Sequence, residues 1–169
     1  MAANTIQGNY IGVDATGSLL RPNHTGILLS DSSNNVNGGT TATARNVISG
    51  NETHGIEIFG SGNVIQGNFI GTNAAGTAEI GNRDCGLIIT SAPFTDNLIG
   101  GNLAGAGNLI SGNSRGVSIQ GLAPGNTIQG YLIGTDITGT KKIPNGVGIQ
   151  AEAPNSLVGG PTRAARNLI

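Results

Sequence analysis

The sequence is poor in aromatic, sulfur-containing and charged residues. It has no Trp, only three Phe and two Tyr, a single Cys, and 10% charged residues. The lone Cys85 excludes an internal disulfide framework. The eight basic residues are scattered and the formal net charge is −1, so the electrostatic footprint of a nucleic-acid-binding protein is missing. No apolar run approaches a membrane span, and Met1-Ala-Ala is not a signal peptide. We therefore predict no nucleic-acid partner and no membrane insertion.

What the sequence has in abundance is Gly and Asn, 30 and 20 of its 169 residues. Both residues tolerate a positive φ, so they suit a chain that turns corners often. Low charge would also suit a disordered chain, but Ile, Leu and Val recur here at regular spacing, which argues against disorder.

An internal repeat organises the chain. The segment Asn63-Val-Ile-Gln-Gly-Asn-Phe-Ile-Gly-Thr recurs as Asn4-Thr-Ile-Gln-Gly-Asn-Tyr-Ile-Gly and as Asn126-Thr-Ile-Gln-Gly-Tyr-Leu-Ile-Gly. The copies start 59 and then 63 residues apart. Such self-similarity is typical of repeat architectures.

A Gly followed by alternating apolar residues marks one strand in each repeat unit. The strands begin at Gly26, Gly55, Gly86, Gly116 and Gly146, which is every 29 to 31 residues. Because side chains alternate in a strand, one set points inward and the other outward. The predicted inward pairs are Ile27/Leu29, Ile56/Ile58, Leu87/Ile89, Val117/Ile119 and Val147/Ile149. The predicted solvent face consists of Leu28, Glu57, Ile88, Ser118 and Gly148.

Two further strands follow in each unit, each with an inward residue two places after its opening residue. The second strands open at Asn4, Asn35, Asn63, Asn97, Asn126 and Ser156. The third strands open at Asn9, Asn46, Asn68, Asn108, Tyr131 and Asn167. The inward residue of the third strand is Ile in all six units, from Ile11 to Ile169.

Three short strands in about 30 residues, repeating in register, predict a β-solenoid. Neighbouring coils would lie about 4.8 Å apart with parallel strands, and identical side chains would stack on one another. The corner Asn residues would then form ladders in which each side-chain amide binds the next. An ordinary turn role explains one Asn but not the period.

Two features modify this repeat. The loops alternate, so that long loops protrude from two different corners in successive coils, which gives a double repeat of about 60 residues. Asn37 falls on the inward register and Tyr131 replaces a ladder Asn. We expect a local register shift at Asn37 and a weakened ladder at Tyr131. Asn113 is expected in a short exposed loop, where Asn113→Ala would be tolerated.

The segments 63–77 and 44–51 resemble the parallel β-helix (PbH1-type) repeats of large bacterial secreted and cell-surface proteins. Asn97-Leu-Ile-Gly-Gly and Ser156-Leu-Val-Gly-Gly fit the same pattern. The resemblance covers the whole chain. It implies an all-β, right-handed parallel β-helix and an extracellular or cell-surface location. It does not fix a function, because unlike proteins share this scaffold.

Polysaccharide lyases and hydrolases use the same scaffold, so we searched for their carboxylate clusters. No two of the nine acidic residues fall at equivalent positions in neighbouring coils. Asp14, Asn73 and Asp136 are equivalent but recur only in every second coil, about 9.6 Å apart, which is too far to share one ion. Their Gly-Thr-Asp-x-x-Gly setting favours an Asx-type turn.

One group of reactive side chains lies at a corner. His54 and Cys85 each precede the Gly of a first strand in adjacent coils, Asp84 lies beside Cys85, and His24 lies one coil earlier. Stacking would bring His54 and Cys85 within about 5–6 Å, close enough for a thiolate–imidazole pair or part of a metal site. The alternative is a pair of loop residues that vary between copies. We assign no catalytic, cofactor-binding or metal-binding residue from the sequence, and no cofactor.

The sequence thus predicts one solenoid domain over 1–169, of five to six coils starting near 26, 55, 86, 116 and 146. We predict a non-catalytic scaffold: a rigid rod, spacer or end-to-end assembly unit. The alternative is a polysaccharide-binding or polysaccharide-processing β-helix, with Tyr10 and Phe69 as equivalent aromatic contacts. Neither end shows a capping segment, so self-association or flanking coils of a longer chain would cover the terminal coils.

Overall fold

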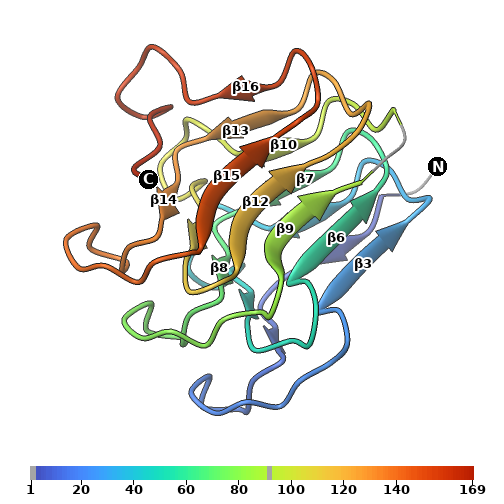
Figure 1. Cartoon of the computed structure of the whole chain (residues 1–169). Helices are drawn as coiled ribbons and strands as arrows, with labels where there is room; N and C mark the ends of the chain where they lie inside the picture. Colours follow the sequence, from blue (N-terminus) through green and yellow to red (C-terminus); the bar gives the residue numbers. More distant parts are fainter. Residues whose placement is uncertain (1–2, 91–92) are drawn as a thin grey trace.

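The computed structural model describes residues 3–90 and 93–169, and these residues form a parallel β-solenoid (Figure 1). The absence of a signal peptide was predicted from residues 1–3, and residues 1–2 of that segment lie outside the described residues. The described chain has sixteen short strands and no helix. It therefore has no helix that could span a membrane. The predicted all-β fold, with about 30 residues and three strands per coil, is confirmed.

The strands form three parallel sheets that run along the solenoid. Sheet I, which carries the Gly-initiated strands, contains β3 (Ile27–Ser30), β6 (Ile56–Phe59), β9 (Cys85–Ile89), β12 (Arg115–Ile119) and β15 (Val147–Ala151). Sheet II contains β1 (Thr5–Ile6), β4 (Val36–Gly38), β7 (Val64–Gln66), β10 (Leu98–Gly100), β13 (Thr127–Gln129) and β16 (Leu157–Val158). Sheet III contains β2 (Tyr10–Ile11), β5 (Val47–Ile48), β8 (Phe69–Ile70), β11 (Leu109–Ile110) and β14 (Leu132–Ile133).

The predicted registers are confirmed in sheets II and III and across the first four strands of sheet I. In sheet III, for example, Ile70 pairs with Ile48 on one side and Ile110 on the other, and all three are fully buried. The inward Ile, Leu and Val columns of the three sheets meet in one core cluster. A sixth strand predicted at 167–169 is reduced to a single parallel bridge between Leu132 and Leu168.

Between β12 and β15 the predicted register is wrong. Arg115 pairs with Val147 and Val117 with Ile149, two residues away from the predicted pairing of Val117 with Val147. Asn145 binds Asn113 at the preceding corner, so Gly148 and not Gly146 lies opposite Gly116. Val147, predicted to point inward, is therefore 45% exposed.

Two predicted Asn ladders line two corners of the solenoid. The first ladder comprises Asn4, Asn35, Asn63, Asn97 and Asn126. The second ladder comprises Asn9, Asn46, Asn68, Asn108, Tyr131 and Asn167. At a typical link, the Asn35 Nδ2 and backbone N–H groups both donate to Asn63 Oδ1, at 2.8 and 3.0 Å. Each link between two Asn residues thereby satisfies two donors at the corner, where an unpaired buried donor would be costly.

A third ladder, which the sequence analysis missed, lines the remaining corner. It comprises Asn23, Asn51, Asn82, Asn113 and Asn145. Asn113 is 3% exposed, and its Oδ1 accepts from the Asn82 backbone and side chain at 3.0 and 2.9 Å. The prediction that Asn113 lies in an exposed loop is therefore wrong, and Asn113→Ala is no longer expected to be tolerated. The spacing of 28 to 32 residues was a usable signal.

Asn37 and Tyr131, the two positions that break the repeat pattern, behave differently. No register shift occurs at Asn37, which pairs between Ile6 and Ile65, so that prediction is wrong. Its Oδ1 accepts from Asn46 Nδ2 at 2.8 Å, but its own buried Nδ2 has no partner. Tyr131 replaces one Asn by offering its phenol oxygen to Asn108 Nδ2 at 2.9 Å.

The long loops after sheet III fold back instead of only protruding. In each, an antiparallel bridge closes a hairpin: Val13 with Leu20, Thr72 with Glu79, and Thr135 with Lys142. Ala74 N–H donates to Gly17 O at 3.0 Å and Ile137 N–H to Gly76 O at 2.9 Å, so alternate loops bind one another. Beneath them Val13, Val47, Phe69 and Leu109 form a second buried cluster on the outer face of sheet III.

The outer face of sheet I is less exposed than predicted. Leu28 is 54% exposed, but Ile88 and Ser118 are buried. These two residues pair side by side in neighbouring strands, and Gln120 Nε2 donates to Ser118 Oγ at 3.2 Å. Adjacent side chains on closely spaced strands therefore cover both positions.

Candidate functional site

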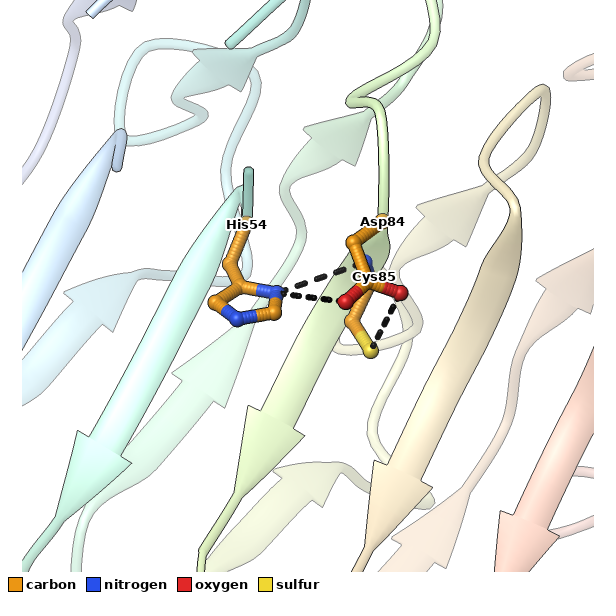
Figure 2. Close-up of side chains that lie close together, drawn as sticks. All are labelled: His54, Asp84 and Cys85. Carbon is orange, nitrogen blue, oxygen red and sulfur yellow. Dashed lines mark hydrogen bonds and ion pairs between the residues drawn. The ribbon is translucent and has the colours of Figure 1, made fainter. Parts of the chain in front are cut away.

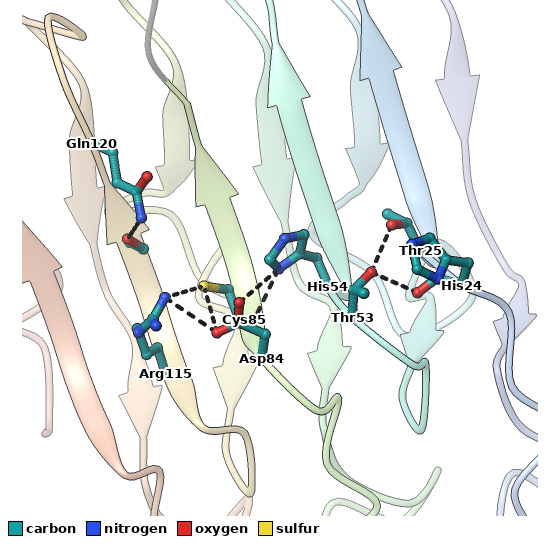
Figure 3. Close-up of polar contacts among 9 residues, drawn as sticks. His24, Thr25, Thr53, His54, Asp84, Cys85, Arg115 and Gln120 are labelled. Carbon is teal, nitrogen blue, oxygen red and sulfur yellow. Dashed lines mark hydrogen bonds and ion pairs between the residues drawn. The ribbon is translucent and has the colours of Figure 1, made fainter.

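A row of polar side chains crosses the corner where the strands of sheet I begin. Figure 3 shows it running from Thr25 and His24 through His54 and Cys85 to Arg115. The row exists because a Gly occupies the next position in each coil. At Gly86, an added Cβ would lie 2.7 Å from Ile110 Cγ2 and 2.9 Å from Asn113 Nδ2. The core leaves no room for a side chain there, so the functional groups gather on the outer side of the corner.

His54, Asp84 and Cys85 converge at the centre of this row. Figure 2 shows the imidazole, which lies just before β6, facing the carboxylate and the thiol at the start of β9. His54 Nδ1 lies 4.0 Å from Asp84 Oδ2, and Cys85 Sγ lies 3.7 Å from Asp84 Oδ1. One nitrogen, oxygen or sulfur from each residue lies within 4.8 Å of the others. The proximity of His54 and Cys85 predicted from the coil spacing is thus confirmed.

Arg115 completes the cluster, and the sequence analysis did not include it. Its Nη1 lies 3.2 Å from Asp84 Oδ1 and 3.7 Å from Cys85 Sγ. The signal was available, because Arg115 precedes Gly116 as Cys85 precedes Gly86. Burial, reinforced by the charge of Asp84, raises the pKa of the Cys85 thiol to about 11, although Arg115 opposes the shift. The resting thiol is therefore protonated and a poor nucleophile.

His24 does not join this cluster. Its Nδ1 lies 3.5 Å from Glu52 Oε2, and its side chain is 79% exposed. Between the two histidines, Thr53 Oγ1 donates to His24 O at 2.7 Å and lies 2.9 Å from Thr25 Oγ1. This hydroxyl pair separates His24 from the convergent groups of the next coil.

The acidic loop positions form the predicted Asx-type turns. Asp14 Oδ1 accepts from the Ser18 and Leu19 backbone N–H groups, both at 3.1 Å, and from Thr16 Oγ1 at 2.8 Å. These bonds, led by that from Ser18, lower the pKa of Asp14 to about 2. Hydrogen bonds from Thr138, Lys141 and Thr140 lower the pKa of Asp136 in the same way. Each carboxylate therefore organises its own loop.

The two aromatic residues named for polysaccharide contact differ in exposure. Tyr10 is 48% exposed, whereas Phe69 is 3% exposed. Arg45 Cζ lies 4.0 Å from the centroid of the Phe69 ring and covers it. A sugar would therefore meet Tyr10 but not Phe69, so the predicted pair does not form one stacking surface.

A groove of about 720 Å³ lies between two of the long loops. Its sides combine apolar and oppositely charged side chains, from Leu19, Leu20, Arg21, Glu79 and Ile80. Comparison of the chain with protein-family models, with curated proteins and with solved structures finds no match in any of the three.

Proposed function

We propose that this solenoid is a non-catalytic scaffold that acts as a rigid rod or spacer. The observation that carries the proposal is the continuity of the three Asn ladders and the apolar core from coil to coil. Each coil is held by its neighbours through backbone bonds, side-chain amides and stacked Ile residues. Such contacts between neighbouring coils fix the length and direction of the solenoid, so they favour a rigid rod over a protein built around a deformable cavity. By the resemblance of its repeats, the rod belongs to an extracellular or cell-surface bacterial protein.

Rigidity is testable by distance measurement between two spin labels. Leu28 and Gln150 occupy the same register on the outer face of sheet I, four coil steps apart. At about 4.8 Å per step, their backbones lie about 19 Å apart. In a Cys85→Ser background, electron–electron resonance should give one narrow distance distribution for labels at these sites. A broad or bimodal distribution would contradict a rigid rod, and the same label pair measured in denaturant gives the control for a broad distribution.

Coils of the same kind are the partners we propose for the outermost coils. The last coil exposes apolar side chains on strands β15 and β16, including Val147, Leu157 and Val158. Another coil, from a longer chain or a second copy, would bury them. Sedimentation velocity should detect association that Leu157→Lys suppresses, since charged edge residues block strand addition. If the protein is monomeric at all concentrations tested, a second copy is excluded as the partner, and only further coils of a longer chain remain.

The polysaccharide alternative is tested on the same preparation. A scaffold should neither retain nor degrade polysaccharides in a binding and depolymerisation screen. Micromolar binding that disappears in Tyr10→Ala would replace the scaffold proposal with a glycan-binding one.

A further inference from the structure

The scaffold proposal does not use the cluster of His54, Asp84 and Cys85. Three different donor types, an imidazole nitrogen, a carboxylate and a sulfur, meet there from two adjacent coils (Figure 2). We propose that these three residues bind one Zn²⁺ ion, with a fourth position open to solvent. Nitrogen, oxygen and sulfur are the donors that zinc uses in proteins, and three protein ligands with one open position form a recognised class of zinc site. The hard cations Ca²⁺ and Mg²⁺ prefer oxygen donors alone.

The geometry requires only small side-chain movements. With metal–ligand bonds of about 2.0–2.3 Å, the donors of a tetrahedral zinc site lie about 3.3–3.7 Å apart. Cys85 Sγ lies 3.7 Å from Asp84 Oδ1, and His54 Nδ1 lies 4.0 Å from the other oxygen, Asp84 Oδ2. One donor atom from each of the three residues lies within 4.8 Å of the others, so the set must contract by about 1 Å around an ion. The coil-to-coil pairing of β6 and β9 fixes the backbones that carry these groups. The Asp84 side chain is 39% exposed, so it is free to turn toward an ion.

Arg115 places a positive charge where the ion would bind. Its guanidinium contacts the same Asp84 carboxylate and Cys85 sulfur that the ion would take. Zinc must therefore shift Arg115 away from the Cys85 sulfur and from the carboxylate oxygen that the ion takes, while the second Asp84 oxygen remains able to accept from the guanidinium. The Arg115 side chain is 36% exposed, so its guanidinium is free to turn into solvent. The thiol then releases its proton to water, and the resulting thiolate binds the metal.

Binding also breaks one hydrogen bond at the site. The Cys85 backbone N–H donates to His54 Nδ1 at 3.4 Å, a long hydrogen bond that coordination through Nδ1 would break. Zn²⁺ gains bonds to three donors in exchange. The displacement of Arg115 and the loss of the thiol proton therefore both oppose binding, and the affinity should rise with pH.

Cobalt titration tests the proposal directly, because Co²⁺ takes the same ligand types and its thiolate complexes absorb in the near ultraviolet. The intact chain should develop a thiolate-to-cobalt charge-transfer band and tetrahedral visible bands, and Zn²⁺ should abolish both. Cys85→Ser should remove the charge-transfer band. His54→Ala should weaken Co²⁺ binding at least about tenfold, since even outer-shell partners commonly contribute that much. Arg115→Gln should strengthen it about tenfold by removing a positive charge beside the ion.

The matched control is His24→Ala, which removes the other histidine of the chain, one coil earlier and beside Glu52, and should leave the titration unchanged. Circular dichroism establishes that each variant is folded, and if Cys85→Ser does not fold, the His54 and Arg115 variants carry the test. No charge-transfer band in either the intact chain or Arg115→Gln would overturn the proposal. So would a band whose Co²⁺ dependence is the same with and without His54. Neither result depends on whether the chain is a rod.

Discussion

The second and third ladders solve the same problem at two corners, but only the third is built from Asn throughout. In the third ladder, Asn82 and Asn113 are joined by two hydrogen bonds, from a side-chain amide and a backbone N–H group. In the second ladder, Asn108 meets Tyr131, whose phenol accepts only from the Asn108 amide in the described structure. The comparison teaches that each corner requires a hydrogen-bond acceptor opposite the donors of the preceding coil. The oxygen of an Asn side chain accepts from both of these donors, the side-chain amide and the backbone N–H group.

The largest effect is expected in the core that both ladders enclose. Ile70→Ala should lower the free energy of unfolding by about 2–5 kcal/mol, because it removes buried methyl groups and leaves a cavity between Ile48 and Ile110. Chemical denaturation measures the change. A loss below about 0.5 kcal/mol, the usual value for a surface site, would show that the column is not packed as described.

The two ladders should respond alike when a regular Asn is removed. Asn68→Ala and Asn113→Ala should each cost about 1–3 kcal/mol, because buried donors in the neighbouring coils lose their acceptor. Asn102, which is exposed in a loop, provides the control and should tolerate the change. If all three variants lost equal stability in denaturant, turn propensity and not the ladder would be responsible.

A stabilising substitution is expected beside the second ladder. Asn37→Ile should raise the free energy of unfolding by about 1 kcal/mol, because it removes an unpaired buried Nδ2 and continues the column of Ile6 and Ile65. Asn46 Nδ2 would still donate to Ile6 O and Asn68 Oδ1. A thermal melt that falls instead of rising would mean that the Asn37–Asn46 bond outweighs the unpaired group.

The irregular link itself can be tested by removing one atom. Tyr131→Phe keeps the buried ring but deletes the acceptor of Asn108 Nδ2, and it should cost about 1 kcal/mol. Asn108 Nδ2 would retain its bond to Ile65 O, so the effect should be smaller than that of Asn68→Ala. If Tyr131→Phe cost as much free energy of unfolding as Asn68→Ala, or more, the phenol oxygen would contribute more to the stability of this corner than the hydrogen bonds indicate.

The smallest effect is expected in the loops that cover sheet III. The pKa of Asp14 is lowered from 3.8 to about 2 in the folded protein, so its contribution to stability is present above pH 3.8 and disappears as the pH falls toward 2. Asp14→Asn should remove this pH dependence and change the neutral-pH melting temperature little, since Asn73 makes the same turn. Melting curves across this pH range, identical for both proteins, would contradict the assignment.

Most of the fold follows from the sequence because a solenoid repeats one local rule. The inward Ile of the third strand recurs in register, and so does the Gly before each of the first four sheet I strands, so a single coil predicts its neighbours. The register of β15 was mispredicted because Gly146 and Gly148 both precede apolar residues and only the ladder position of Asn145 distinguishes them. The third ladder was missed because Asn23, Asn51 and Asn82 precede no apolar alternation and look like ordinary turn residues. Asn37 was misjudged for a different reason: register is fixed by the strands above and below, which hold one polar residue in place.

The candidate site was only partly visible in the sequence. Coil spacing brought His54 and Cys85 together correctly, because backbone register determines that distance. The position of the Arg115 guanidinium depends on side-chain torsions, which a repeat pattern does not specify. The burial of Phe69 beneath Arg45 likewise depends on a long side chain that reaches across from an adjacent coil.

The ladder bonds also give the solenoid a polarity. In every link between two Asn residues, the Nδ2 group donates toward the C-terminal coil and the carbonyl oxygen faces the N-terminal one, as from Asn35 to Asn63 and from Asn51 to Asn82. Three columns of amide dipoles therefore point the same way along the axis. A coil added in the same orientation would extend all three columns at once. An inverted coil would place carbonyl against carbonyl or amide against amide. Any coil that extends the ladders must therefore have the same orientation as the coils already present.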